Sequence, residues 1–108
     1  MMKLNQSMIP ATMFLLMLIT SCAKNPLPCF MTNPEEDNIH VSQPVTFSAY
    51  CSNNSEEFFW EFYGNEDSIE FGPVVTKYFS DTGTVKVAMT AINGTKAAIY
   101  KQDILVKP

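Results

Sequence analysis

Three cysteines, Cys22, Cys29 and Cys51, carry the most distinctive chemistry in this chain. A thiol can pair with a second thiol, carry a lipid, bind a metal or act as a nucleophile. An odd number of cysteines cannot be fully paired within one chain, so one of the three needs a different explanation from the other two. The residues around each cysteine therefore have to indicate its role.

Cys22 ends a segment with the features of an export signal. Lys3 gives a short positive start, and the apolar run 13–19 is too short to span a bilayer as a permanent helix. The tetrapeptide Ile19-Thr20-Ser21-Cys22 resembles the lipobox of bacterial lipoproteins, which implies cleavage before Cys22 and a lipid on its sulfur. Several acyl chains on this residue would anchor the protein firmly. The alternative is an ordinary secretory signal in which Cys22 has no special role.

With Cys22 carrying lipid, Cys29 and Cys51 are the remaining pair, and disulfides persist in exported proteins. We predict a structural disulfide between them, worth about 3 kcal/mol because it closes a long loop. The alternatives are two free thiols or a redox pair. Their spacing lacks the Cys-x-x-Cys arrangement of redox sites, which disfavours the second alternative.

The other groups capable of chemistry do not form a recognisable site. The sole histidine, His40, has no nucleophile near it in the sequence. The neighbouring run Glu35-Glu36-Asp37 can be interpreted as a metal site, but a solvated loop is the commoner explanation for such a run, and no liganding motif accompanies it. We therefore expect a protein that is not an enzyme, with no catalytic residue, no metal site and no cofactor.

Charge excludes a further class of function. The 108 residues carry a formal net charge of −4 and include no arginine, and the lysines are scattered along the chain. Nucleic-acid binding requires clustered basic side chains, so a nucleic-acid partner is disfavoured. The same scarcity argues against electrostatic adhesion to anionic lipids.

Short alternating runs beyond Pro28 predict an all-β fold. Trp60 and Phe62 share one face of such a run and are expected in the core. The pair Asn93-Gly94 predicts a two-residue hairpin turn. Seven short strands of this kind predict a seven-stranded β-sandwich. The expected strands cover residues 39–41, 45–50, 58–62, 69–71, 74–78, 84–91 and 97–106.

Aromatic residues that are expected to point away from the core are the candidates for binding. Tyr50, Phe59 and Tyr63 fall on the outward positions of their strands or next to a loop. Exposed rings can stack on sugars or anchor a protein partner. The alternative is that these rings pack across neighbouring strands or are isolated surface residues without a function.

The stretch from Pro44 to Val106 resembles a PKD domain, an immunoglobulin-like module of extracellular and envelope proteins. The matching motifs are Gln43-Pro44-Val45-Thr46-Phe47, Trp60-Glu61-Phe62, Tyr78 with Gly83-Thr84, Asn93-Gly94, and Ile104-Leu105-Val106. The chain departs from the family at Tyr63-Gly64-Asn65, where Gly-Asp-Gly is usual, and this puts the local loop in doubt. Cys29-Phe30 and Cys51-Ser52 resemble a variant found in envelope lipoproteins of Bacteroidetes. The resemblance implies an immunoglobulin-like β-sandwich.

Together these features predict a signal peptide over 1–21, a lipidated cysteine and tether over 22–38, and a PKD-like sandwich over 39–108. The prolines of the tether are expected to hold the domain off the membrane. The predicted function is that of an envelope-anchored lipoprotein, most simply of the outer membrane, which acts as a non-catalytic binding module for protein or glycan. The alternative is a structural or accessory subunit of an envelope complex without its own ligand. The sequence leaves open whether the module faces the periplasm or the cell surface.

Overall fold

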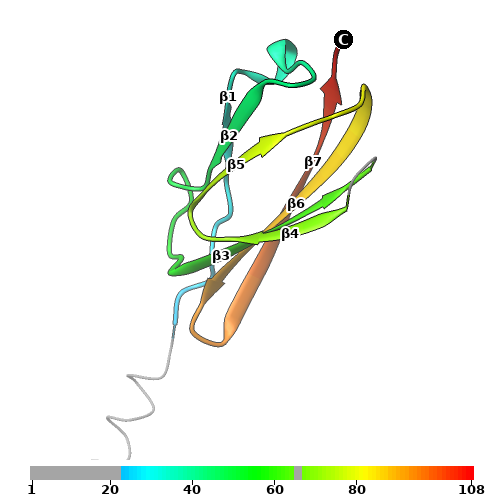
Figure 1. The fold of residues 1–108 in the computed structure, drawn as a ribbon. Helices are drawn as coiled ribbons and strands as arrows, with labels where there is room; N and C mark the ends of the chain where they lie inside the picture. The colour runs from blue at the N-terminus through cyan, green and yellow to red at the C-terminus, as the bar shows by residue number, and fades with distance from the viewer. Residues whose placement is uncertain (1–22, 65–66) are drawn as a thin grey trace, which may run out of the picture.

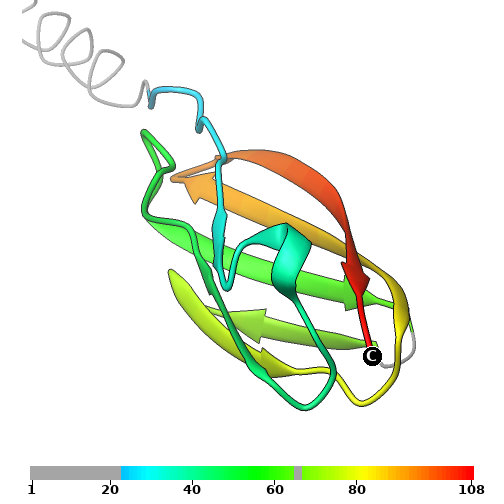
Figure 2. The ribbon, with the colours of Figure 1, turned by 90° about the horizontal axis from the view of Figure 1, so that it is seen from above.

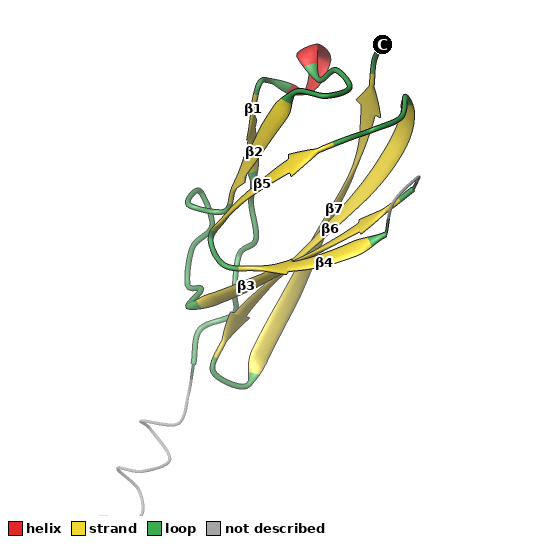
Figure 3. Ribbon diagram, viewed as in Figure 1, coloured by secondary structure: helices red, strands yellow, loops and turns green. Residues whose placement is uncertain are grey.

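The computed structural model describes residues 23–64 and 67–108. The predicted signal peptide and Cys22 lie outside the described residues. The described part consists of strands joined by turns, with one short 3₁₀ helix, η1, at one end of the molecule (Figure 3). In chain order the elements are β1 (Met31–Asn33), η1 (Glu36–Asn38), β2 (Pro44–Ser48), β3 (Glu57–Tyr63), β4 (Ser68–Phe71), β5 (Val74–Tyr78), β6 (Gly83–Asn93) and β7 (Lys96–Val106).

The strands form two antiparallel sheets that pack into a β-sandwich (Figure 1). One sheet has three strands in the order β1-β2-β5, and the other has four in the order β4-β3-β6-β7. The prediction of an all-β sandwich is therefore confirmed. The described residues contain no helix of the length and hydrophobicity needed to cross a membrane.

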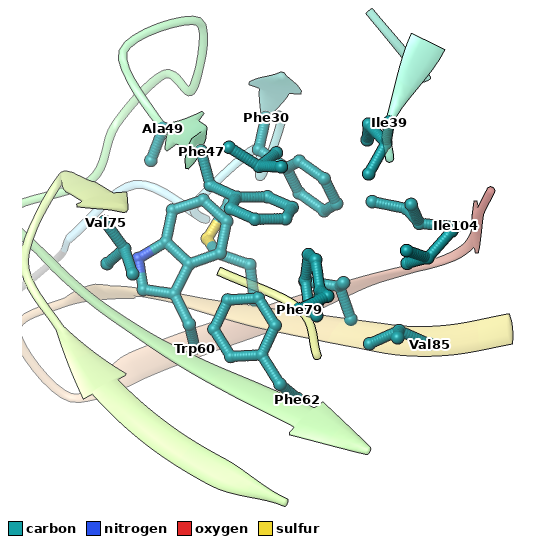
Figure 4. Close-up of a cluster of buried hydrophobic side chains, with 14 of the residues drawn as sticks. Phe30, Ile39, Phe47, Ala49, Trp60, Phe62, Val75, Phe79, Val85 and Ile104 are labelled. Atoms are coloured by element: carbon teal, nitrogen blue, oxygen red, sulfur yellow. The ribbon is translucent and has the colours of Figure 1, made fainter. Parts of the chain in front are cut away.

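The core lies between the sheets and is rich in aromatic rings (Figure 4). Trp60 and Phe62 of β3 have no exposed surface, because alternate residues of a strand point to one face. Phe47 of β2 meets them from the other sheet, with ring centroids 5.9 Å from Trp60 and 5.1 Å from Phe62. The indole N–H of Trp60 donates to the carbonyl of Gly72 at 2.8 Å, so this buried polar group is satisfied.

Lys77 of β5 covers the core at the side of the sandwich where the chain passes from β4 in one sheet to β5 in the other. Its ammonium lies 5.1 Å from the centroid of the Phe62 ring, donates to Ser68 Oγ at 2.7 Å and lies 3.6 Å from a Glu70 oxygen. The methylene stem of a lysine can cover apolar surface while its charge stays near water. Lys77 therefore joins the edges of the two sheets.

The N-terminal segment is part of the sandwich, which corrects the predicted tether over 22–38. The disulfide between Cys29 and Cys51 is confirmed, with a Cα–Cα distance of 5.4 Å. Phe30 is buried with its ring centroid 5.3 Å from that of Trp60, and β1 pairs with β2. The covalent bond and the buried ring together hold this segment against the three-stranded sheet. The domain boundary expected at Ile39 therefore falls inside the fold.

Two local predictions were wrong. Residues 39–41 form one parallel bridge and not a strand, with Val41 N–H donating to the Lys107 carbonyl and Lys107 N–H donating to the Ile39 carbonyl. Pairing stops there because Ser42 has a φ of 61°, which turns the chain.

The other error concerns the hairpin between β6 and β7. Its two loop residues are Gly94 and Thr95, flanked by the pair Asn93 and Lys96, and not the predicted Asn93-Gly94. Gly94 has a φ of 63°, and a turn with positive φ at its first loop position favours glycine there.

Candidate binding face

The outer face of the four-stranded sheet carries a row of side chains that crosses all four strands. Since Trp60 points into the core, its neighbour Phe59 points outward. Phe59 pairs with Phe71 of β4 on one side and with Thr90 of β6 on the other, and Thr90 pairs with Ile99 of β7. Directly paired residues lie on the same face, so these four form one continuous row. We call this outer face the aromatic face.

The aromatic face exposes large apolar groups to solvent. Phe71 is 77% exposed, Ile69 is 59% exposed and Ile99 is 57% exposed. Phe59 is half-buried, and its ring centroid lies 6.2 Å from that of Phe71. Contiguous apolar residues on a soluble surface often mark a site of interaction. The two rings are tilted by 44° relative to each other and offer a non-planar hydrophobic platform at the β4 edge of the sheet.

Polar groups lie among apolar ones in the rows next to this row. Tyr63 donates its phenolic hydrogen to a Glu61 oxygen at 2.5 Å. This hydrogen bond, helped by partial desolvation and by the negative charges of Glu61 and Asp67, raises the pKa of the Tyr63 phenol. Lys86 pairs with Tyr63, and Asp103 of β7 pairs with Lys86. The aromatic face thus combines rings with donors and acceptors within two rows of each other.

Thr90, in the middle of the apolar row, has an unusual environment. The residue is 5% exposed, and its hydroxyl oxygen has no hydrogen-bond partner among the described residues. A buried hydroxyl without a partner costs free energy, and most such groups in folded proteins are paired. Its cross-strand neighbours in the sheet are Phe59 and Ile99.

A small hollow adjoins Phe71 at the edge of the sheet. It has a volume of about 230 Å³. Its walls come from the start of β3 and the turn between β4 and β5. The hydrogen bond from Trp60 to the Gly72 carbonyl holds one of these walls in place. The lining residues are Glu56, Glu57, Phe58, Phe71, Gly72 and Pro73.

The structure brings together only two of the three residues predicted to bind. Phe59 and Tyr63 lie on the aromatic face, four positions apart along β3, which is roughly 13 Å. Tyr50 is 74% exposed but lies in the loop after β2, a strand of the other sheet. The alternation along a strand shows which residues point outward, but it does not show which sheet the strand joins. For this reason Tyr50 was predicted to lie with Phe59 and Tyr63.

Sequence reasoning missed the most exposed ring of the face. Phe71 and Ile69 alternate with Ser68 and Glu70 in β4, whereas Ile99 of β7 lies between Ala98 and Tyr100 and shows no such alternation. That alternation was the available signal. The pairing of Phe71 with Phe59, which gives the signal its meaning, depends on contacts between strands and is not encoded locally.

The acidic run and His40 lie at the opposite end of the molecule from the entry of the chain. Gln102 donates a hydrogen bond to Glu36, and the Lys107 ammonium donates to the Asp37 carbonyl at 2.5 Å. His40 Nδ1 lies 2.9 Å from a Pro108 oxygen. An open hollow of about 380 Å³ lies beside the acidic run. No cluster of three His, Cys, Asp or Glu side chains suited to a metal occurs within 23–64 and 67–108.

No protein-family model matches the chain, and no curated protein matches its sequence. The fold is similar to a solved structure from work on the promiscuous specificity of carbohydrate-binding modules of the β-sandwich superfamily, with a TM-score of 0.68 and 19% identity. The match covers 80% of this chain and 36% of the other, so this chain spans about a third of that structure's length. At this identity the likeness shows a shared β-sandwich fold.

Proposed function

We propose that this protein is an envelope lipoprotein, anchored through lipid on Cys22, whose single PKD-like sandwich is a non-catalytic module that binds glycan on the aromatic face. The observation that carries the proposal is the apolar row across four strands, with Phe71 77% exposed at its edge. An all-β sandwich buries its inner faces to fold, so two neighbouring rings on an outer face are not required for folding.

The chemistry of the face suits a sugar chain. Phe59 and Phe71 offer ring faces that can pack against the C–H side of a pyranose. Glu61 and Asp103 offer carboxylate oxygens, which accept hydrogen bonds from sugar hydroxyls, and Lys101 offers donors in the row next to the rings. A site with both kinds of group can bind a ligand that is apolar on one side and polar at its rim.

Two further observations support the proposal without being specific to it. The similar solved structure belongs to work on carbohydrate-binding modules. The lipobox-like tetrapeptide Ile19-Thr20-Ser21-Cys22 supports a place in the envelope, where polysaccharides are abundant. If the aromatic face binds a protein and not a glycan, the site is as proposed but the class of ligand is different.

The experiment is a glycan-array screen of the full-length, lipidated protein in detergent, followed by titration of the best glycan. The variant Phe71→Ala is expected to weaken binding about tenfold, since it removes a ring from the platform. The variant Tyr50→Ala is the matched control, because it removes an equally exposed ring from a loop of the other sheet. Equal weakening by both variants, or no glycan bound by the parent protein, would contradict the proposal.

A further inference from the structure

The first described residues are fastened to one end of the sandwich. Asn93, the last residue of β6, donates its side-chain N–H to the Lys24 carbonyl at 2.9 Å. Asn54 donates in the same way to the Asn25 carbonyl at 3.4 Å. Two backbone hydrogen bonds also hold the segment. The Leu27 N–H donates to the Asn53 carbonyl at 3.0 Å, and the Asn53 N–H donates to the Leu27 carbonyl at 3.1 Å.

The attachment continues to the disulfide. Ser52 Oγ accepts a hydrogen bond from the Cys29 N–H at 2.8 Å and donates one to the Cys29 carbonyl at 2.7 Å. Pro26 is buried, and Cys29 is bonded covalently to Cys51. The segment 24–29 therefore has fixed contacts along its whole length. It does not have the freedom of a flexible linker.

The end that receives this segment consists of the β6–β7 turn and the loop between β2 and β3. Figure 1 places the entry of the chain, in blue, opposite the C-terminal Pro108 and η1, and in Figure 2 the same blue segment runs beside the orange strand ends that the β6–β7 turn connects. A Cβ added at Gly94 would lie 3.9 Å from the Cβ of Ala23, so Ala23 lies beside the turn itself. Cys22 directly precedes Ala23, and one residue spans at most about 3.6 Å.

We propose that the sandwich stands directly on the lipid bilayer, with the β6–β7 turn and the β2–β3 loop facing the headgroups. This inference rests on the proposed lipidation of Cys22. A lipid on that residue enters the membrane next to the turn, and the contacts of segment 24–29 prevent the domain from swinging away. The anchor thus determines the orientation of the module as well as its location.

The composition of this end suits contact with headgroups. Thr95 and Lys96 of the turn and Asn54 of the loop are exposed and can hydrogen-bond to phosphate and ester oxygens. The charges of Lys24 and Lys96 are partly offset by Glu56 in the same region. Electrostatic attraction is therefore weak, and the lipid anchor holds this end at a zwitterionic surface as well as at an anionic one.

The orientation has a consequence for the aromatic face. Thr90 lies three residues before Asn93 in β6, so the apolar row is roughly 10 Å from the membrane-facing turn. The aromatic face must then bind its ligand close to the surface of the bilayer.

The experiment uses full-length, lipidated protein in phosphatidylcholine vesicles that contain a lipid with a nitroxide on its headgroup. Thr95→Trp places a fluorescent reporter at the turn, and Thr84→Trp places a matched reporter near the other end of β6, about 35 Å away. Both threonines are exposed, and the buried Trp60 contributes the same background to both variants. We expect the nitroxide to quench Thr95→Trp several-fold more strongly than Thr84→Trp. Asn93→Ala, which frees the Lys24 carbonyl, is expected to reduce this contrast.

The outcomes separate this inference from the proposed function. Intact mass and co-flotation with vesicles first report whether Cys22 carries lipid. Protein without lipid overturns both the anchoring and the orientation. Lipidated protein with equal quenching of the two reporters overturns the orientation alone, because the anchor is then present on a domain that moves freely.

Discussion

The outer faces of the two sheets differ in how their apolar side chains are arranged, although both sheets contribute to one core. On the three-stranded sheet, the paired residues Asn33, Thr46 and Thr76 form a row of short polar side chains. The exposed apolar side chains of this face, Met31, Val74 and Tyr78, lie in other rows, and only one of them is aromatic. On the four-stranded sheet, a row across all the strands consists of Phe71, Phe59, Thr90 and Ile99. Short polar residues are what a solvated β-surface requires.

This difference separates what the fold requires from what it does not. The three-stranded sheet shows that an outer face with no aromatic row is compatible with the same sandwich and the same core. The rings of the aromatic face therefore represent a feature beyond folding. Substitutions in the inner layer should change the free energy of unfolding, and those on the aromatic face should change ligand binding.

The largest effect is expected from the inner layer that both sheets share. Trp60→Ala should lower the free energy of unfolding by about 4 kcal/mol, because it leaves a cavity between the sheets. Urea denaturation monitored by circular dichroism measures this loss. Trp60→Phe, which keeps a ring but loses the hydrogen bond to the Gly72 carbonyl, should cost less. Two variants of parental stability would show that this ring is not central to the core.

The second effect concerns the N-terminal segment. The double variant Cys29→Ser/Cys51→Ser should lower the free energy of unfolding by about 3 kcal/mol, because the open chain gains conformational entropy. The midpoint of urea denaturation checks this value, with reduced parent protein as the control. A variant as stable as the oxidised parent would mean that Phe30 and the backbone pairing hold the segment alone.

A smaller effect of opposite sign is expected at Thr90. Thr90→Val replaces a buried hydroxyl without a partner by a methyl group, which should raise the free energy of unfolding by about 1 kcal/mol. Thr46→Val, on the polar outer face of the other sheet, should change it by less than about 0.5 kcal/mol. Thermal denaturation of the two variants side by side makes the comparison. Destabilisation by Thr90→Val would indicate that its hydroxyl has a partner in solution.

The smallest effect is a pH dependence at the polar rim of the aromatic face. The pKa of Tyr63 is raised, chiefly by its hydrogen bond to Glu61, so its contribution to stability is present below the pKa of the unfolded chain. That contribution is lost as the pH rises through the higher pKa of the folded state. Near-ultraviolet absorbance should show Tyr63 losing its proton late, and Glu61→Gln should advance this step. A titration that Glu61→Gln leaves unchanged would contradict the assignment.

Local alternation predicted the inner layer well, because it depends on residues two apart in one strand. Val85 and Val87 show this pattern as clearly as Trp60 and Phe62, and all four are buried. The strand at Met31–Asn33 was missed because a run of three residues, Met-Thr-Asn, is too short to show an alternation of apolar and polar side chains. Its place is determined by the disulfide and by the burial of Phe30, which are contacts between distant parts of the chain.

The candidate site was only partly predictable for the same reason. Phe59 and Tyr63 lie in one strand, so their shared face followed from the sequence. Phe71 joins them by pairing between β3 and β4, and Tyr50 is excluded because β2 belongs to the other sheet. Sheet membership is a property of the whole fold.

If the aromatic face binds ligand and the outer face of the other sheet does not, then removing a ring from each face must have different effects on binding. The most direct test compares Phe71→Ala with Tyr78→Ala, which removes an exposed ring from the outer face of the three-stranded sheet. Calorimetric titration with the best glycan from the array should show binding weakened about tenfold by Phe71→Ala and unchanged by Tyr78→Ala, with similar unfolding free energies for both. Binding that is unchanged in Phe71→Ala, or lost equally in both variants, would contradict the proposal.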